Sequence, residues 1–242
     1  MYHQVGRFRS PKNHRAQFCH VRRFRGQMRY LHYFGYNVLS LEQALKGLFH
    51  GEPLPPKPVV LTFDDGYRNF YENAVPILAD YGFPAIVYAV SNLIGGRNQW
   101  VEATGREGAD LMDLNSLREL GRHNIAIGSH SLTHPRLSQI PEDRMRREVL
   151  ESKARLEDLL GQPVPDFCYP YGDYDERVRD AAIEAGYRSA LTCIRGAANT
   201  ADNAWEIPRK AISFGDLLPG FWWKIHKKNE KKLRPGKNAI AY

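Results

Sequence analysis

The chain has 242 residues, of which 43% are hydrophobic and 25% are charged, as in an ordinary globular protein. Apolar residues recur throughout, which excludes a wholly disordered chain, and no run approaches the roughly 18 apolar residues of a transmembrane helix. The net charge of +7 is concentrated at the two ends, so an evenly basic protein is also excluded.

The first stretch of the chain, residues 1–41, contains eight Lys or Arg residues and no acidic residue. Its opening, Met1 to Val5, lacks the apolar core of a signal peptide. This predicts a cytoplasmic protein or one that is peripheral at a membrane, and an extracytoplasmic protein if a leader preceded Met1.

Strands and helices are predicted to alternate along the rest of the chain. The first helix opens with a capping box, in which Ser40 is the N-cap and Gln43 lies three residues on. The long charged helix has Pro141 at its first position, and Gly186 ends the last predicted helix. The predicted helices are residues 41–49, 70–81, 113–123, 141–160 and 175–185, and the predicted strands are residues 59–63, 85–90, 125–128, 167–169, 188–192 and 207–212.

This alternation from residue 59 to 212 predicts βα units around a parallel sheet. An open, doubly wound sheet and a closed barrel both satisfy the pattern. Both architectures place chemistry at the carboxyl ends of the strands, so candidate site residues are expected there.

Two adjacent carboxylates, Asp64 and Asp65, directly follow the strand at 59–63. Such a pair is costly unless a cation or a hydrogen-bond donor holds it. Successive residues point in different directions, so one carboxylate can bind a metal while the other acts as a base. Gly66 permits a sharp or left-handed turn. The alternative is an ordinary turn with an N-cap aspartate.

Two histidines, His130 and His134, follow the strand at 125–128 with a spacing of i, i+4. On one helical turn this spacing places both imidazoles on one face, about 5–6 Å apart, where they can share a cation. The alternative is two unrelated surface histidines. One Asp and two His leave a coordination position for water, which is the catalytic arrangement for zinc, although other divalent metals suit the same donors.

An aromatic loop, Tyr169-Pro170-Tyr171-Gly172, follows the strand at 167–169. A tight loop of this kind can wall a groove and direct a backbone N–H at a developing oxyanion. The alternative is an aromatic-rich turn without a role in chemistry. The cysteines are Cys19, Cys168 and Cys193; they fit no disulfide framework and no C-x-x-C zinc spacing, which predicts buried or idle thiols.

Three segments in this order, VVLTFDDGY, SHSLTHP and FCYPYGDYD, resemble the first three motifs of the polysaccharide deacetylase family. The opening Tyr2-His3-Gln4-Val5 and the Tyr-Pro-Tyr form of the third motif resemble the branch that de-N-acetylates poly-N-acetylglucosamine in biofilms. The resemblance implies an α/β fold, a distorted (β/α)7 barrel formed by residues 1–242 as one domain with its core at 59–212. It also implies a metal-dependent hydrolase that removes acetyl groups from the N-acetylated sugars of a free or lipid-linked glycan.

The same resemblance assigns roles to individual residues. Asp65, His130 and His134 match the ligands of one divalent metal, zinc in the first instance. Asp64 matches the catalytic base, the backbone N–H of Tyr171 matches an oxyanion donor, and Arg209 matches the residue that orients the base.

The chain also departs from the family pattern. Phe167-Cys168-Tyr169 stands where many members have an arginine, and no Leu-x-His motif follows Arg209. The proton donor for the leaving amine is therefore open between His226, water at the metal, and Asp64 after it has taken a proton. A catalytically decayed carbohydrate-binding protein and an amidase acting on a non-sugar C–N bond remain alternative readings.

The last stretch, residues 224–242, contains seven Lys or Arg residues and one acid, Glu230. The middle of the chain has a net charge of −7, so the basic character belongs to the ends. Basic ends predict association with an anionic membrane surface or an anionic glycan, and solvated tails are the alternative. Nucleic acid is not favoured, because no nucleic-acid-binding module is readable.

Overall fold

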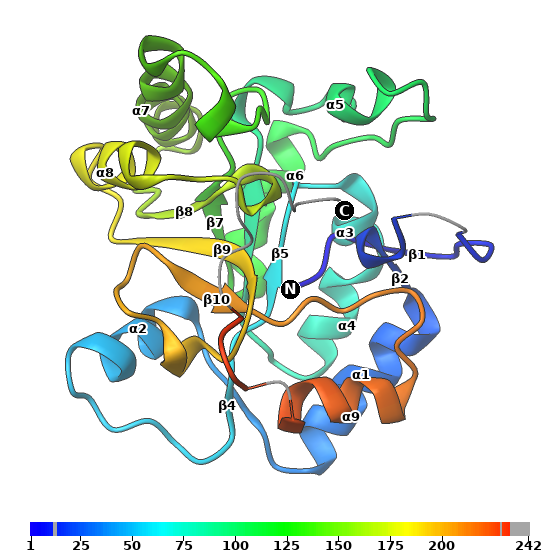
Figure 1. Cartoon of the computed structure of the whole chain (residues 1–242). Coiled ribbons are helices and arrows are strands. Elements are labelled where there is room, and N and C mark those ends of the chain that lie inside the picture. Colours follow the sequence, from blue (N-terminus) through cyan, green and yellow to red (C-terminus); the bar gives the residue numbers. More distant parts are fainter. Residues whose placement is uncertain (12–13, 228, 233–242) are drawn as a thin grey trace.

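The computed structural model describes residues 1–11, 14–227 and 229–232. Within this part, six parallel strands form a curled central sheet in the order β10-β9-β8-β7-β6-β5, with helices packed around it (Figure 1). The strands are β5 (Thr62–Phe63), β6 (Ala85–Ala89), β7 (Ile125–Ser129), β8 (Asp166–Cys168), β9 (Ser189–Arg195) and β10 (Ile207–Arg209). The protein thus has an α/β fold with a parallel half-barrel sheet.

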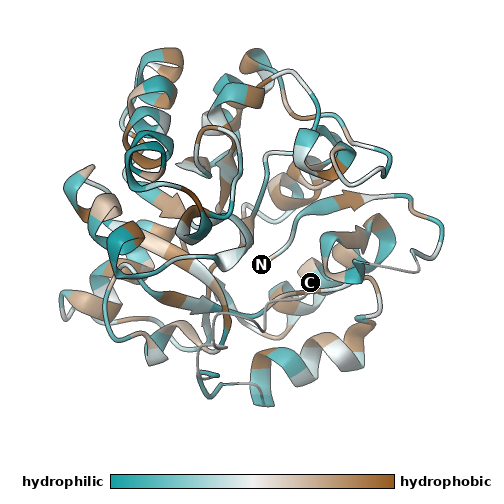
Figure 2. Cartoon of the chain, turned by 45° about the horizontal axis from the view of Figure 1, so that its top comes forward, coloured by the Kyte–Doolittle hydropathy of each residue, from teal (hydrophilic) through white to brown (hydrophobic). Residues whose placement is uncertain are grey.

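Helices cover the outside of the sheet and carry hydrophobic and hydrophilic residues in alternation along their turns (Figure 2). The α-helices are α1 (Val21–Tyr33), α2 (Leu41–Phe49), α3 (Arg68–Asn73), α4 (Val75–Asp80), α5 (Gln99–Glu102), α6 (Leu114–Glu119), α7 (Glu142–Leu160), α8 (Glu176–Glu184) and α9 (Leu218–Lys227). Short 3-10 helices are η1 (Arg15–Gln17), η2 (Ser91–Leu93), η3 (Leu120–His123), η4 (Leu137–Gln139), η5 (Pro170–Gly172) and η6 (Ala198–Thr200). Two small parallel pairs complete the fold, β1 (Gln4–Gly6) with β2 (Phe18–His20) and β3 (Asn37–Val38) with β4 (Pro58–Val59).

Met1 and Tyr2 fill the space between β5 and β10, the two edge strands of the sheet. The backbone N–H of Tyr2 donates to the Thr62 carbonyl at 2.9 Å, and its carbonyl accepts from the Asp64 N–H at 3.0 Å. On the other side, the Ile212 N–H donates to the Met1 carbonyl at 2.9 Å. These bonds link the two sheet edges. The described sheet itself has six strands, and the count of seven that the resemblance implies stays a prediction.

Several predicted elements are confirmed and others are divided or displaced. The Ser40–Gln43 capping box is present, with both reciprocal hydrogen bonds. The predicted strand at 59–63 is wrong as a single strand, because the chain changes partner from β3 to β6 and forms β4 and β5 separately. The predicted helix at 70–81 is divided into α3 and α4, since Pro76 lacks an N–H and its ring blocks a continuous helix. Pro141 is the N-cap of α7 and not its first helical residue.

The basic N-terminal segment is part of the packed fold. It contains α1, whose inner face buries Phe24, Met28 and Leu31 in the main hydrophobic core. The sequence reading did not predict this helix, because arginines dominate its outer face. Near the other end, α9 buries Phe221, whereas Trp222 and Trp223 are 40% and 52% exposed.

Association of the basic ends with an anionic surface stays a prediction. Residue 228 and residues 233–242 of the basic C-terminal stretch lie outside the described residues. Among the helices that the structure describes, none combines the length and apolarity needed to cross a bilayer.

Gly128 on β7 provides a test of how tightly the sheet is packed. A Cβ at this position would lie 2.4 Å from the Tyr88 ring and 2.9 Å from the Asp166 carbonyl oxygen. We expect Gly128→Ala to lower the free energy of unfolding by about 1–3 kcal/mol through overpacking, as measured by urea denaturation. Gly121→Ala is the control, because a Cβ there has no neighbour within 4 Å. Equal stability of the two variants would contradict this account of the core.

Candidate active site

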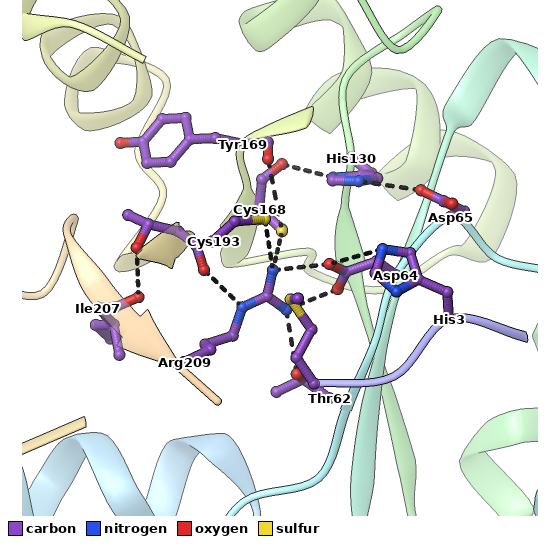
Figure 3. Close-up of polar contacts among 12 residues, drawn as sticks. His3, Thr62, Asp64, Asp65, His130, Cys168, Tyr169, Cys193, Ile207 and Arg209 are labelled. Carbon is purple, nitrogen blue, oxygen red and sulfur yellow. Dashed lines mark hydrogen bonds and ion pairs between the residues drawn. The ribbon is translucent and has the colours of Figure 1, made fainter. Parts of the chain in front are cut away.

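Three loops at the carboxyl ends of β5, β7 and β8 converge at one end of the sheet. They carry the carboxylate pair, the two histidines and the aromatic loop that the sequence identified. In Figure 3, Asp64 points toward Arg209 and Asp65 points toward His130. The structure therefore brings together Asp64, Asp65, His130, His134, Tyr171 and Arg209.

The turn after β5 separates the two adjacent carboxylates. Asp65 has a φ of 74° and Gly66 a φ of 75°, so both adopt the left-handed conformation that the sequence allowed for at Gly66. A left-handed aspartate is uncommon and is maintained only when its surroundings fix it. Here the turn directs the side chains of Asp64 and Asp65 to different partners.

Asp65, His130 and His134 form a buried cluster that fits a metal ion. Asp65 Oδ1 lies 3.3 Å from Nε2 of each histidine, and both Asp65 oxygens are buried and make no hydrogen bond to the part of the chain that the structure describes. The Cys168 carbonyl oxygen lies 2.7 Å from His130 Nδ1, which favours a proton on Nδ1 and leaves the Nε2 lone pair facing Asp65. A divalent cation would bind the Asp65 carboxylate and the two imidazole nitrogens. One oxygen and two nitrogens form a donor set that suits zinc, among other metals.

The electrostatics of the cluster keep its members in the form that binds cations. Burial by itself would raise the pKa of Asp65, but the two facing imidazoles outweigh it and hold this pKa well below its usual value. Burial lowers the pKa of His134 to about 4. Near neutral pH the carboxylate is therefore ionised and the imidazole is neutral, as ligation requires.

The two histidines meet through a loop and not through the helical turn that their spacing suggested. His130 follows β7, and the residues up to His134 form an irregular loop. Ser131 and His134 have φ values of 66° and 64°, and the His134 N–H donates to Ser131 Oγ at 3.0 Å. The imidazole centroids are 4.8 Å apart. The predicted proximity is thus observed, but its helical explanation is wrong.

Glu148 on α7 binds the loop between the two histidines through hydrogen bonds. Its carboxylate accepts hydrogen bonds from the backbone N–H groups of Leu132 at 3.0 Å and Thr133 at 2.9 Å, and from the Thr133 hydroxyl at 2.5 Å. Glu148 is 4% exposed. The sequence did not identify Glu148 as a site residue. The signal that could have found it is an acidic residue on the same buried helix face as Met145 and Val149.

Arg209 and Asp64 form a buried bidentate ion pair. Arg209 Nη1 and Nη2 each lie 2.7 Å from a different oxygen of Asp64. Further bonds of the guanidinium go to Thr62 Oγ1, the Thr192 carbonyl and Cys168 Sγ. Burial alone would raise the pKa of Asp64, but the charge of Arg209 outweighs it, and this pKa is lowered. Asp64 therefore remains an ionised carboxylate despite its burial.

His3 is a second residue that the sequence reading missed as a site residue. Its Nε2 lies 3.9 Å from Asp64 Oδ2, and its Nδ1 is buried with no hydrogen-bond partner among the described residues. The signal was the Tyr-His-Gln-Val opening, which was noted only as a point of resemblance. Figure 3 shows His3 beside Asp64, on the segment that closes the sheet.

His226, by contrast, is not brought to the site. It lies on α9, with Nε2 2.9 Å from the Tyr36 hydroxyl and Nδ1 2.9 Å from the Trp222 carbonyl. Both contacts belong to the outer helical layer. His226 therefore cannot donate a proton to a group bound at Asp64.

Aromatic rings flank the histidine cluster on two sides. Trp100 stacks on His134 with a centroid distance of 4.1 Å, and Tyr171 packs edge-on against the same ring at 4.5 Å. Tyr171 has a φ of 59°, and within the described residues its backbone N–H donates to no protein acceptor. That N–H is available to a substrate oxygen.

The family comparison agrees with this geometry. The family model described as polysaccharide deacetylase matches residues 51–190, more than half of the chain. The chain belongs to the polysaccharide deacetylase family. It is thus a hydrolase of the class that cleaves the N-acetyl amide bonds of glycans.

Relatives of this deacetylase include the protein YxkH of Bacillus subtilis (strain 168), 28% identical over 218 residues that cover 89% of this chain and 71% of YxkH. The poly-β-1,6-N-acetyl-D-glucosamine N-deacetylase of Escherichia coli (strain K12) is 26% identical over 86% of this chain, which spans only 35% of that protein. Among solved structures, the deacetylase PplD of Streptococcus pyogenes, in complex with acetate, has a TM-score of 0.78 and 26% identity, covering 93% of this chain and 95% of PplD.

The role of Glu148 in this deacetylase can be tested through metal affinity. We expect Glu148→Ala to weaken zinc binding by about 10–100-fold, because the loop between the two histidines loses its anchor. Glu148→Gln keeps one acceptor and should lose less. Competition titration with a chromophoric chelator measures the affinity, and thermal unfolding of the metal-free proteins measures any loss of fold. Glu151→Gln, on the exposed side of α7, is the control. Unchanged zinc affinity in Glu148→Ala would contradict an anchoring role.

Proposed function

We propose that this protein is a metal-dependent hydrolase that removes acetyl groups from N-acetylated amino sugars in an oligo- or polysaccharide. Poly-N-acetylglucosamine is the leading substrate class, supported by the relatives of that activity. The observation that carries the proposal is the pairing of two neighbouring sites, a carboxylate–imidazole cluster at Asp65 and an ionised carboxylate at Asp64. Zinc is the metal that we propose first, because the donor set and its burial suit it.

Each residue of the site has a place in the proposed reaction. Asp65, His130 and His134 would hold the divalent cation, which would supply Lewis acidity toward the acetamide carbonyl and acidify water. Asp64, ionised beside Arg209, accepts a proton from the attacking water. The Tyr171 N–H stabilises the negative charge that develops on the carbonyl oxygen. The products are acetate and a free amine.

His3 is the residue that we propose as proton donor to the leaving amine. Its Nε2 lies 3.9 Å from Asp64 Oδ2, so this imidazole is next to the proposed base. His226 lies remote from the site, so we propose His3 in its place, beside the two other donors that the sequence left open, water at the metal and protonated Asp64. An active enzyme is supported over a decayed binding protein, since the chain has candidate residues for the base, the ligand set and the donor.

Asparagine substitutions test which of the two aspartates accepts the proton and which binds the metal. Asp64→Asn preserves shape but removes the proton acceptor, so we expect it to retain zinc and to lose about 10²–10⁴-fold in kcat. Asp65→Asn should lose both zinc and activity, because a ligand is removed. Metal content by mass spectrometry and acetate release from an N-acetylated oligosaccharide are the two measurements. Zinc loss in Asp64→Asn with retention in Asp65→Asn would reverse the roles, and full activity of Asp64→Asn would refute the base.

The donor role of His3 is tested with two leaving groups. We expect His3→Gln to lower amide hydrolysis by about 10²–10⁴-fold, because the amine must leave protonated. Hydrolysis of an aryl acetate should fall far less, since a phenolate leaves without a proton. His226→Gln is the matched control and should hydrolyse both substrates like the wild type. An equal loss on both substrates for His3→Gln would show that His3 acts on binding or folding instead.

A further inference from the structure

The exposed aromatic side chains gather where α1 and α9 lie side by side (Figure 1). Elsewhere in the described residues, only Leu150 and Ile183 are large hydrophobic side chains that are exposed. A concentration of this kind marks an interaction surface. We call this surface the α1–α9 face. Its exposed hydrophobic members are Tyr33 and Phe34 at the end of α1, and Leu217, Leu218, Trp222 and Trp223 at the start and middle of α9.

Ring contacts join the aromatic residues of the two helices. Phe34 is 58% exposed and stacks on Tyr30, with ring centroids 4.4 Å apart. Tyr30 in turn packs edge-on against Phe221 of α9 at 6.1 Å. Trp222, the next residue along α9, stacks on His226 at 4.6 Å. The α1–α9 face is therefore one continuous aromatic surface whose rings hold one another in place.

A stripe of arginines runs along α1 beside these rings. Arg22, Arg25 and Arg29 are exposed and are spaced by three and four residues, which places them on one face of the helix. Arg25 pairs with Asp80 at 2.9 Å, whereas the other two make no ion pair within the described residues. Arg22 and Arg25, with Arg7, also line a hollow of about 510 Å³. The stripe thus combines uncompensated positive charge with room for a phosphate-bearing group.

We propose that the α1–α9 face docks on the surface of a lipid bilayer that contains anionic lipids. Tyr and Trp rings prefer the boundary between headgroups and acyl chains, and basic side chains are attracted to anionic headgroups. Tyr33, which is 75% exposed, lies four residues beyond Arg29, so the stripe of charge leads directly to an aromatic ring. No helix that the structure describes could cross the bilayer, so the docking is peripheral. This inference concerns where the protein works and does not depend on the proposed reaction.

A second copy of this chain fits the face less well than a bilayer does. In a two-fold symmetric dimer the same surface patch of each copy would meet its counterpart. Two equally basic stripes would then lie against each other, and like charges in an interface repel. An anionic lipid surface instead complements the arginines and also accepts the rings.

Vesicle binding tests the charge complementarity. The zinc-loaded protein is sedimented with vesicles of phosphatidylcholine, with and without phosphatidylserine, and the bound fraction gives the affinity. We expect at least about 25-fold tighter binding to the anionic vesicles at low salt, because each of the two unpaired arginines contributes about 5-fold near an anionic surface. The difference should shrink at high salt.

Paired arginine variants locate the charge that binds. Arg22→Gln with Arg29→Gln should weaken binding to the anionic vesicles by about 25-fold. The matched control is Arg144→Gln with Arg147→Gln, which removes two exposed charges from α7, away from α1 and α9 (Figure 1). It should bind like the wild type. No binding of the wild type to anionic vesicles, or equal losses in the two double variants, overturns the inference.

Paired serine variants test the rings. Tyr33→Ser with Trp223→Ser should weaken binding to both kinds of vesicle by about 10-fold, because less apolar surface enters the interface. Leu150→Ser with Ile183→Ser is the matched control and should bind like the wild type, and circular dichroism checks the fold of each variant. Unchanged vesicle binding in Tyr33→Ser with Trp223→Ser overturns the inference. So does a dimer in analytical ultracentrifugation that this variant abolishes, which would assign the face to a second copy.

Discussion

The buried ion pair between Asp64 and Arg209 is the constraint on which the site depends. Removing two charges from water costs several kcal/mol per ion, and only good geometry with further hydrogen bonds offsets this cost. The guanidinium meets the requirement by bonding both Asp64 oxygens and also Thr62 and Thr192. Asp64 follows β5 and Arg209 ends β10, so the pair joins the two edges of the sheet. The same ion pair therefore links the two edges of the sheet and keeps the proposed base ionised.

This arrangement also gives the two adjacent aspartates different surroundings. Both oxygens of Asp64 are engaged by Arg209, whereas both oxygens of Asp65 are buried and make no hydrogen bond within the described residues. An unsatisfied buried carboxylate is destabilising, so the metal-free protein is strained at Asp65. Left-handed backbone at Asp65, Ser131 and His134 adds to this strain. Metal binding would relieve it, which couples stability to function at the same residues.

The sequence predicted which candidate residues lie close together better than it predicted the path of the chain. Buried runs such as 85–90 and the capping box at Ser40 have local causes, and they were found to within a residue or two. The division of 59–63 depends on a change of strand partner, which is a tertiary event that no local pattern encodes. The same holds for His3, which reaches Asp64 only because Tyr2 closes the sheet. The motif residues could be predicted because each directly follows a strand. Supporting residues such as Glu148 could not, because they lie on helices that pack against the site from outside.

Hydrogen bonds from Glu148 explain why a loop can replace the expected helical turn between the two histidines. In a helix the backbone N–H and C=O groups would bond to one another. The helical pitch would then fix the distance between the two imidazoles. The loop leaves the N–H groups of Leu132 and Thr133 free, and Glu148 binds them from α7. The position of the histidines is then set by the packing of α7 against the sheet and not by local backbone geometry. The core beneath α7 therefore helps to set how the two candidate metal ligands face each other.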